Sequence, residues 1–482
     1  MRQRGRASSE EVTRDAGAAR VPVDDKRAAR VPVDDKRAAQ VPSGATPAAR
    51  FDAVVVGAGP AGSAAALVLA KAGRSVCLLE RGPFPGSKNL FGGVIYAKVL
   101  DDLVPSWRDE APLERWVTRR ATMVLTETQS LSVDFRSGAW GRPPYNGATA
   151  LRPRFDAWLA EAAVAAGADL VTSTTATGLV RKPGTGAVAG VTTDRPDGTL
   201  LADAVVACDG VNAFLAKEAG CAGEPDPAHF TLGVKEVIAL GADEIESRFG
   251  LPPGEGADFE ILGGSGGVAG GGFLYTNLDT VSVGLVLSLQ GLSRSGRRPE
   301  ELLAGLKAHP AIEPLVGGGA LVEYGAHLIP EAGLAMMPKL AADGFVVAGD
   351  AAGMCLAAGL WLEGVNFAIA SGAAAGRAVV EALGAGDLRG SRLESAYRGQ
   401  LRKGFVLADL TRFRRAPALL LSERVQNRYP ELVCDLVEQM FTVGNPVPKP
   451  GLRSLTRTQA TRAGVRWRDL VRDAWTAMRA FG

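Results

Sequence analysis

The chain has 482 residues, of which 46% are hydrophobic and 22% are charged, as expected for a globular protein of two or three domains. Its formal net charge is +2, so no overall field favours nucleic acid as a partner. There are three histidines, none paired with another at metal-ligand spacing, and five widely separated cysteines, which argues against a zinc site, an iron–sulfur cluster or a disulfide scaffold. The cysteines are Cys77, Cys208, Cys221, Cys355 and Cys434.

Residues 1–50 differ from the rest of the chain. The ten residues "VPVDDKRAAR" at 21–30 return as "VPVDDKRAAQ" at 31–40. The segment is polar and has too few large apolar residues to offset chain entropy, so we expect a disordered leader. A binding tail is the alternative. Because no apolar signal-peptide core is present, we expect a cytoplasmic protein.

From Phe51 the sequence "FDAVVVGAGPAGSAAALVLAKAGRSVCLLERG" predicts a strand, a glycine turn, a helix and a second strand. The run 54–56 is apolar throughout, as in a buried parallel strand, and 64–70 has strong helix-forming composition. Gly73 can end that helix, and "SVCLLE" at 75–80 forms the next buried strand. We therefore expect a βαβ unit with short connections.

The turn in this unit carries the spacing G-x-G-x-x-G at Gly57, Gly59 and Gly62. The first glycine permits the tight turn, the second lets a pyrophosphate approach the backbone, and the third lets the helix pack on the strand. Glu80 closes the following strand and can accept the ribose hydroxyls of an adenosine. A dinucleotide site is the preferred interpretation, and a purely structural glycine turn is the alternative. The similar run "GSGGVA" at 264–269 lacks a following helix, and we expect a hairpin or loop there.

Between about 225 and 330 the pattern changes to that of an antiparallel sheet. The segments 231–240 and 280–289 run or alternate apolar at strand length. One predicted strand face carries five aliphatic residues, which are Val281, Val283, Leu285, Leu287 and Leu289. We expect this sheet to form a second layer or domain.

A late segment identifies the dinucleotide as FAD. A buried strand at 345–348 leads directly to Gly349 and Asp350, and an Asp at a strand end can take hydrogen bonds from a ribityl chain. A helix N-cap is the other interpretation of that Asp. A helix beginning near Gly364 points its positive end at the flavin ring, where it stabilises negative charge.

The stretch 351–376 contains one charged residue, Glu363, and is long enough to cross a bilayer, which takes about 20 apolar residues. Its glycines, its glutamate and its position after a strand favour burial against a cofactor, and a membrane span is the alternative.

The C-terminal part, 387–482, is predicted to be helical and is basic, with 18 Lys and Arg against 9 Asp and Glu. Its last predicted helix has an apolar stripe with arginines beside it. A helix of this kind lies in the headgroup layer of a membrane, or docks on the protein body or on a partner subunit. The stripe consists of Trp467, Leu470, Val471, Ala474, Trp475 and Met478.

The segments "FDAVVVGAGPAGSAAALVLAKAG", "LLERGPFPGSKNLFGG", "LRPRFDAWL", "HLIPEAG" and "VVAGDAAG" resemble the family of FixC and the electron transfer flavoprotein–quinone oxidoreductases. The resemblance extends over about 51–482. This family lies within the larger superfamily of p-hydroxybenzoate hydroxylase-like and geranylgeranyl reductase-like flavoproteins. It implies an α/β fold with a Rossmann-like, glutathione-reductase-like FAD domain, an antiparallel substrate or quinone domain and a helical C-terminal region.

With this resemblance the chain divides into the leader (1–50), the first part of the FAD domain (51–225), the antiparallel domain (226–330), the closing part of the FAD domain (331–386) and the basic helical region (387–482). The resemblance assigns the AMP and pyrophosphate half of FAD to Gly57, Gly59, Gly62, Glu80 and Arg81. It assigns the flavin half to Lys88, Gly92, Gly93, Gly349, Asp350, Gly364 and Asn366, and it places Arg152 at the phosphate or ribityl region. Arg152 also has a simpler interpretation, as an ordinary arginine at a helix start.

The resemblance implies an oxidoreductase that takes electrons from an electron transfer flavoprotein of the FixA/FixB type and passes them to quinone. The larger quinone oxidoreductases end in a cysteine-rich cluster domain. This chain has only Cys434 there, so a ferredoxin-like protein of the FixX type would supply the cluster. A lipid-soluble acceptor further implies peripheral contact with the inner face of the cell membrane.

Two alternatives remain open at this point. The first is an NAD(P)H-dependent flavin reductase or hydroxylase, such as a prenyl reductase, and the second is a subunit whose FAD is structural. The sequence offers no catalytic acid, base or nucleophile, because electron transfer needs none.

Overall fold

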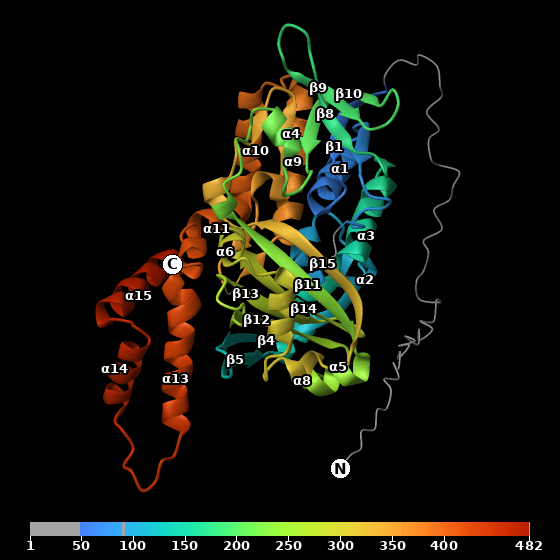
Figure 1. Cartoon of the computed structure of the whole chain (residues 1–482). Helices are drawn as coiled ribbons and strands as arrows, with labels where there is room; N and C mark the ends of the chain where they lie inside the picture. The colour runs from blue at the N-terminus through green and yellow to red at the C-terminus, as the bar shows by residue number, and fades with distance from the viewer. Residues whose placement is uncertain (1–48, 89–91, 360, 482) are drawn as a thin grey trace, which may run out of the picture. The chain divides into compact units, whose positions relative to one another are not determined.

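We describe the protein from a computed structural model, which covers residues 49–88, 92–359 and 361–481 (Figure 1). The predicted disordered leader lies almost wholly outside these residues, as does the centre of the "PGSKNLFGG" segment. The described chain contains two large sheets, a set of helices against each, and a C-terminal group of helices.

The first sheet has the central order β16-β17-β10-β1-β2-β7, and from β17 to β7 all pairs are parallel. The predicted strands at 54–56 and 75–80 are its central strands β1 and β2. An antiparallel hairpin, β8 and β9, extends from β10. The strands are β1 (Arg50–Val56), β2 (Val76–Leu79), β7 (Asp169–Val171), β8 (Ala176–Arg181), β9 (Val188–Thr193), β10 (Thr199–Ala207), β16 (Ala341–Ala342) and β17 (Phe345–Val347).

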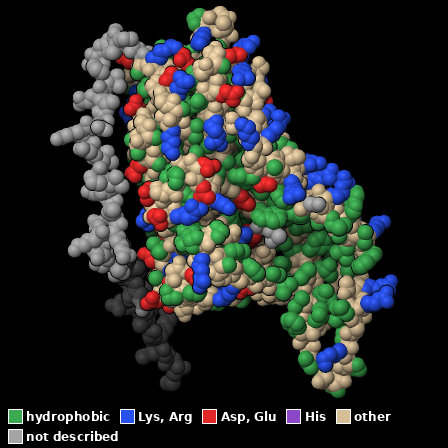
Figure 2. Space-filling view, turned by 180° about the vertical axis from the view of Figure 1, so that it is seen from behind, with side chains coloured by type: hydrophobic (Ala, Val, Ile, Leu, Met, Phe, Trp, Pro, Cys, Tyr) green, Lys and Arg blue, Asp and Glu red, His purple; other side chains and the backbone are tan. Residues whose placement is uncertain are grey.

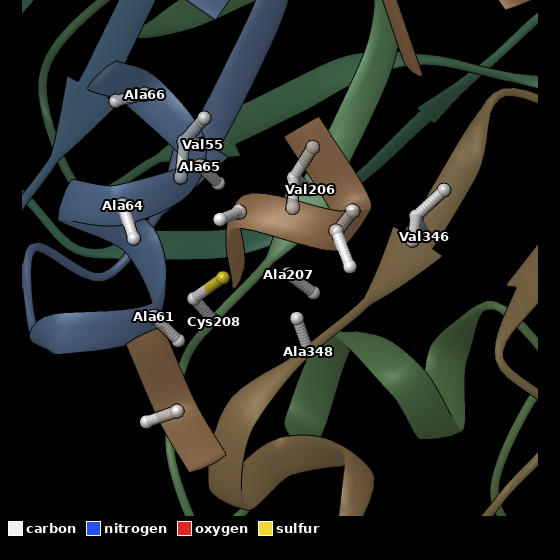
Figure 3. Close-up of a cluster of buried hydrophobic side chains, with 14 of the residues drawn as sticks. Val55, Ala61, Ala64, Ala65, Ala66, Val206, Ala207, Cys208, Val346 and Ala348 are labelled. Atoms are coloured by element: carbon white, nitrogen blue, oxygen red, sulfur yellow. The ribbon is translucent and has the colours of Figure 1, made fainter. Parts of the chain in front are cut away.

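Four helices pack beside this sheet: α1 contacts α3 and α9, and α9 contacts α10 (Figure 1). Pro60 at the first position starts α1, where a missing N–H costs nothing. Figure 3 shows that small side chains dominate where α1 meets the sheet, among them Ala61, Ala64 and Ala65. The helices are α1 (Pro60–Lys71), α3 (Arg152–Ala165), α4 (Phe214–Glu218), α9 (Val365–Ala385) and α10 (Gly390–Lys403).

The second sheet has the order β15-β11-β14-β13-β12-β4-β6-β3, with β5 paired to β4. All its pairs are antiparallel except β12 with β4. The strands are β3 (Gly92–Ile95), β4 (Leu113–Leu125), β5 (Ser130–Arg136), β6 (Ala148–Leu151), β11 (Phe230–Ala239), β12 (Glu255–Gly263), β13 (Gly270–Thr276), β14 (Thr280–Ser288) and β15 (Ala320–Pro330).

The predicted antiparallel segment 226–330 supplies five of these strands. The other four come from 92–151, which the sequence division left inside the FAD domain. Strands β4 and β12 are more than a hundred residues apart along the chain, and no local pattern signals such a pairing. The run "GSGGVA" connects β12 to β13 as a hairpin, as expected.

One face of this sheet is covered by helices α5, α7 and α8, and the short α6 lies between β14 and α7. Val281, Val283, Leu285 and Leu287 are fully buried there, as predicted, but Leu289 begins α6 and does not continue the strand. The helices are α5 (Ala242–Phe249), α6 (Leu289–Ser295), α7 (Pro299–Lys307) and α8 (Glu313–Val316). The short α2 (Trp107–Glu110) precedes β4.

The C-terminal region is helical, as predicted. It consists of α11 (Val406–Arg412), α12 (Ala416–Leu420), α13 (Tyr429–Phe441), α14 (Leu452–Arg462) and α15 (Trp467–Phe481). It is joined to the second sheet by hydrogen bonds from Gln129 to Glu438 and from the backbone of Gly270 to Gln426.

Candidate functional site

The loop between β1 and α1 holds three glycines with different surroundings. Gly57 has a φ of +96°, and a Cβ there would lie 2.3 Å from the backbone oxygen of Cys208. A Cβ on Gly62 would lie 1.8 Å from the backbone oxygen of Gly57. At Gly59 the nearest atom to such a Cβ is Nη2 of Arg152, at 4.0 Å. The fold therefore needs Gly57 and Gly62, whereas Gly59 leaves its backbone open to a ligand.

Glu80 lies directly beneath this loop. Its Oε2 accepts a hydrogen bond from the backbone N–H of Ala58 at 3.1 Å, and its Oε1 accepts one from Gly82 at 2.6 Å. The carboxylate thus fixes the loop, a role that the sequence alone did not indicate. Each oxygen keeps a second lone pair, so the predicted contact with ribose hydroxyls is compatible with this geometry.

Arg152 is held over the glycine loop by a two-point contact. Its Nε and Nη2 donate to the two carboxylate oxygens of Asp156, at 2.6 and 2.7 Å, and the Asp156 side chain is fully buried. The pair sits in the first turn of α3, one helical turn apart. A fixed guanidinium above Gly59 provides the positive charge that a pyrophosphate requires, and its contact with FAD stays a prediction.

The predicted Gly-Asp element lies where β17, α1 and α9 meet. Gly349 has a φ of +67°, its N–H donates to Oγ of Ser371, and a Cβ there would approach Cβ of Ala61 to 2.8 Å. Asp350 follows at the strand end, where burial raises the pKa of its carboxyl against the opposing positive charges of His327 and Arg152. The site thus gathers residues from both sheets.

Helix α9 begins at Val365, directly after Gly364, as predicted. Among the residues that the structure describes, no side chain caps this end, so the positive end of its dipole is available to a ligand. Asn366 is buried in the first turn, and its Nδ2 donates to Glu363 at 2.5 Å. Such an end suits the negative charge of a reduced flavin, and the assignment of Gly364 and Asn366 to that ring stays a prediction.

Helix α9 contains much of the apolar stretch for which a membrane span was the alternative to burial. Val365–Ala385 is long and apolar enough to span a membrane, but 67% of its most apolar window is buried within the protein. It crosses α1 closely, because a Cβ on Gly372 would lie 1.9 Å from the backbone oxygen of Ala61. The run is therefore a core helix, as the sequence favoured.

Gly92, Arg81 and Lys88 are among the remaining predicted residues. Gly92 pairs with Leu151 between β3 and β6, which places it beside the residue before Arg152. Arg81 and Lys88 are exposed. Residues 89–91, between Lys88 and Gly92, lie outside the described chain.

The sequence interpretation missed one group near this site. His327 on β15 lies within electrostatic range of Asp350, Arg152 and Arg81, and burial lowers the pKa of its imidazole. It belongs to the "HLIPEAG" segment, which supports the family resemblance but had no predicted role in the site. Its partners are distant in sequence, so no spacing rule could have brought them together.

These features fit FAD on structural grounds, because the loop leaves space at Gly59 alone and a guanidinium lies over that space. A family model described as FAD dependent oxidoreductase matches residues 52–224. The fold and this match define the protein as an FAD-dependent oxidoreductase. The isoalloxazine ring supplies the redox chemistry, and the chain's own residues bind, orient and tune it.

Similar proteins show which family of FAD-dependent oxidoreductases the chain belongs to. A probable electron transfer flavoprotein-quinone oxidoreductase, YdiS of Escherichia coli strain K12, is 41% identical over 86% of this chain and 96% of its own length. Protein FixC of the same strain is 40% identical over 88% and 97%, and protein FixC of Bradyrhizobium diazoefficiens is 38% identical over 90% and 99%. The model of the ETF-QO/FixC family C-terminal domain matches residues 416–482. The chain belongs to the FixC and electron transfer flavoprotein–quinone oxidoreductase family.

Solved structures share the fold at low identity. A geranylgeranyl bacteriochlorophyll reductase-like protein of Thermoplasma acidophilum has a TM-score of 0.68 at 19% identity, covering 89% of this chain and all of its own. The myxobacterial halogenase CndH has a TM-score of 0.59, also at 19% identity, covering 87% and 99%. These likenesses show an FAD-dependent fold only, so they do not favour the reductase or hydroxylase alternative.

Proposed function

We propose that this protein accepts electrons from an electron transfer flavoprotein and passes them through FAD to a membrane quinone. The observation that carries the quinone half of this proposal is an unpartnered apolar face on the C-terminal helices. Ten large apolar side chains of this region are exposed, and Figure 2 shows them as a broad hydrophobic face with Lys and Arg near its edges. They are Val433, Met440, Phe441, Val443, Val447, Leu452, Trp467, Val471, Trp475 and Met478.

Helix α15 buries one of its acidic residues, while its tryptophans and its arginines are exposed. Asp473 is only 8% exposed; its carboxylate accepts two hydrogen bonds from Arg424, at 2.5 and 2.8 Å, and one from the hydroxyl of Tyr429. Trp467 is 74% exposed and Trp475 is 54% exposed. Because α15 buries Asp473 and exposes two tryptophans, its outer face favours contact with an apolar environment such as a membrane.

The C-terminal region also reaches toward the flavin site. The hairpin of β18 (Leu356–Ala357) and β19 (Leu362–Glu363) directly precedes Gly364, and Trp361 at its tip packs on Phe413, with ring centroids 5.1 Å apart. Phe413 in turn contacts Phe481 at the end of α15. Apolar side chains therefore run between the exposed face and the predicted ring position, which suits a hydrophobic acceptor better than a nicotinamide nucleotide.

The donor is proposed from the relatives, one of which is named a probable electron transfer flavoprotein-quinone oxidoreductase. We take the donor to be of the FixA/FixB type. An iron–sulfur protein of the FixX type would bring a cluster from outside, since Cys434 is buried on α13.

An anaerobic absorption experiment tests the proposed direction of electron flow. The FAD-loaded protein is mixed first with NADPH and then with a reduced electron transfer flavoprotein. We expect the visible flavin absorption to stay after NADPH, to bleach with the flavoprotein, and to return when a short-chain benzoquinone is added. Bleaching by NADPH alone would instead establish the reductase or hydroxylase alternative.

A vesicle experiment tests the membrane contact at the inner face of the cell membrane. The double variant Trp467→Ser/Trp475→Ser removes two exposed anchors without touching the Arg424–Asp473 contact. Because a buried large apolar side chain contributes about 1.5–3 kcal/mol, we expect partitioning onto anionic vesicles to fall at least about tenfold, with FAD content unchanged. Phe214→Ser, which alters an exposed aromatic on α4, is the control and should bind as the wild type does. Vesicle binding that survives the double variant would assign the face to a protein partner.

A further inference from the structure

The second sheet carries a group of ionisable side chains on the face opposite its covering helices. Register places Asp258 of β12 opposite Arg120 of β4 and opposite Tyr275 of β13. Glu260 lies two residues further along β12, so it points to the same face. None of these residues belongs to the hydrophobic cluster on the other face, which includes their neighbours Phe259 and Ala121.

Two carboxyls in this group share one guanidinium. Nε of Arg120 lies 3.0 Å from Oδ2 of Asp258, and Nη2 of Arg120 donates to Oε1 of Glu260. The Asp258 side chain is 3% exposed, and its Oδ1 has no hydrogen-bond partner among the described residues. Two ionised carboxylates against one cation would leave a net negative charge in a buried place, which is costly unless one carboxyl holds a proton.

The group borders the predicted flavin position. Glu363, the residue before Gly364, lies within electrostatic range of Arg120, and Tyr96, three residues after Gly93, lies within range of Asp258, Arg120, Glu260 and Glu363. The charged and titratable groups near the carboxyl pair are therefore Arg120 from β4, Tyr96 after β3 and Tyr275 from β13. Glu363 from β19 lies near Arg120 and Tyr96.

We propose that the Asp258–Glu260 pair, held by Arg120, stores a proton and delivers it from Glu260 to the quinone during its reduction. This inference rests on the proposed function. Conversion of a quinone to a quinol takes up two electrons and two protons. A reduced flavin bound at the candidate site would supply both electrons and one proton. Glu260 gives the other proton to the second quinone oxygen and becomes a carboxylate, and solvent then returns a proton to Glu260.

The electrostatics of the pair agree with this role. Burial, followed by the charge of Asp258, raises the pKa of Glu260 to about 8, and burial raises the pKa of Asp258 to about 6. Both pKa values are raised, so the pair favours holding one proton at neutral pH, and we place that proton on Glu260. The pKa of both Tyr96 and Tyr275 is raised by burial, so their hydroxyls stay protonated.

Flavin reoxidation measures proton delivery without any protein donor. The bound FAD is photoreduced without oxygen and mixed with a short-chain benzoquinone in a stopped-flow instrument. In the wild type we expect the rate to fall as the pH rises through about 8. Glu260→Gln should lose this pH step and be slower at neutral pH by on the order of 10²-fold, the usual contribution of a positioned proton donor.

Two further variants make the test specific. Asp258→Asn removes the neighbouring negative charge, so the step should remain but move to lower pH. Glu236→Gln is the matched control, because Glu236 on β11 is also a largely buried, ion-paired carboxylate, bonded to Lys307 on the opposite side of the sheet. It should keep the wild-type profile. A wild-type profile in Glu260→Gln, or no shift in Asp258→Asn, would overturn the proposal.

An infrared titration of the FAD-loaded protein separates this inference from the proposed function. We expect a protonated-carboxyl band that disappears as the pH rises through about 8 and is absent from Glu260→Gln. If the reduced wild-type flavin gives no electrons to benzoquinone, the proposed function fails and the band still decides whether the pair stores a proton. Because burial also raises the pKa of Glu331 to about 7, the band is read from the wild-type minus Glu260→Gln difference, and a difference without a titrating carboxyl band overturns the store itself.

Discussion

Gly59 and Gly62 stand three residues apart in one loop, yet a methyl group added at each has opposite consequences. At Gly62 the methyl carbon would lie 1.8 Å from a backbone oxygen, and backbone cannot give way cheaply. At Gly59 it would meet only the end of the Arg152 side chain, 4.0 Å away. The two positions therefore separate what the fold requires from what the cofactor requires.

We expect Gly62→Ala to lower the free energy of unfolding by about 3 kcal/mol or more, because an overpacked buried contact forces the backbone apart. Gly59→Ala should cost at most about 1 kcal/mol, through the helix cap, but should weaken FAD binding about tenfold or more. Thermal unfolding of the apoprotein and FAD titration measure the two effects. Gly305→Ala, in a helix with open space around the residue, is the control: it should leave FAD affinity unchanged and be neutral or stabilising by about 0.5–1 kcal/mol. Equal FAD affinity in Gly59→Ala and the wild type would contradict the pyrophosphate site.

The residues of the glycine loop and of the Gly-Asp element could be predicted because each carries its signal locally, in spacing and in the preceding strand. Other contributions could not. The hydrogen bond from the Ala58 N–H to Glu80 depends on the exact register of β2 beside β1. The position of His327 beside Asp350 depends on how the two sheets meet.

At the scale of elements, the crossing of α1 and α9 sets the position of the helix end that faces the predicted flavin. Glycines at 372 and 376 let the two helices approach, and the backbone oxygens of Ala61 and Ala65 occupy the space that a side chain would need. The sequence predicted where α9 begins, but the partner of its small-residue stripe became visible only in the fold.

Gly372→Ala should destabilise the protein by about 3 kcal/mol or more, because its methyl group would lie 1.9 Å from the backbone oxygen of Ala61. Gly384→Ala in the same helix is the matched control, since the nearest atom to its methyl group is 4.0 Å away. It should be neutral or stabilising by about 0.5–1 kcal/mol. Chemical denaturation measures both, and equal stability of the two variants would show that α1 and α9 do not cross at Gly372.

For helix α15, the sequence pattern predicted the apolar stripe but not the orientation of the helix. Periodicity predicted its apolar stripe, but could not say which face docks, because the answer depends on Arg424 and Tyr429, more than forty residues away. The structure shows Asp473 turned inward and the stripe turned outward.

The docking of α15 should therefore depend on pH. The hydrogen bonds of Arg424 hold the pKa of Asp473 at about 2, below the unfolded value of about 3.9. A carboxylate with a lowered folded pKa contributes stability that is present above the unfolded value and is lost as the pH falls from about 4 toward 2. Hydrogen exchange in α15 should rise over that range.

Asp473→Asn should raise the same exchange at neutral pH, with a loss of about 2 kcal/mol, the size of a hydrogen bond to a charged group. Glu423→Gln, which breaks the exposed pair with Arg428, is the control and should cost less than about 0.5 kcal/mol. Protection of α15 that is unchanged in Asp473→Asn would mean that the helix is held by its apolar contacts alone.

At the scale of the whole molecule, the residues with predicted roles are divided between the two sheets. The glycine loop and Asp350 come from the first sheet, Gly92 and the Glu260 pair come from the second, and the β18–β19 hairpin connects them to the C-terminal region. The sequence predicted the two sheets separately. It missed that β3 to β6 cross into the second sheet, because non-local strand pairing leaves no periodic signal.

An experimental structure of the FAD-loaded protein with a short-chain benzoquinone tests this arrangement most directly. We predict the pyrophosphate on Gly59 beneath Arg152, the isoalloxazine ring between Gly92 and the start of α9, and the quinone on the side of Glu260. A flavin ring bound away from the start of α9, or a quinone on the far side of the second sheet, would contradict the account.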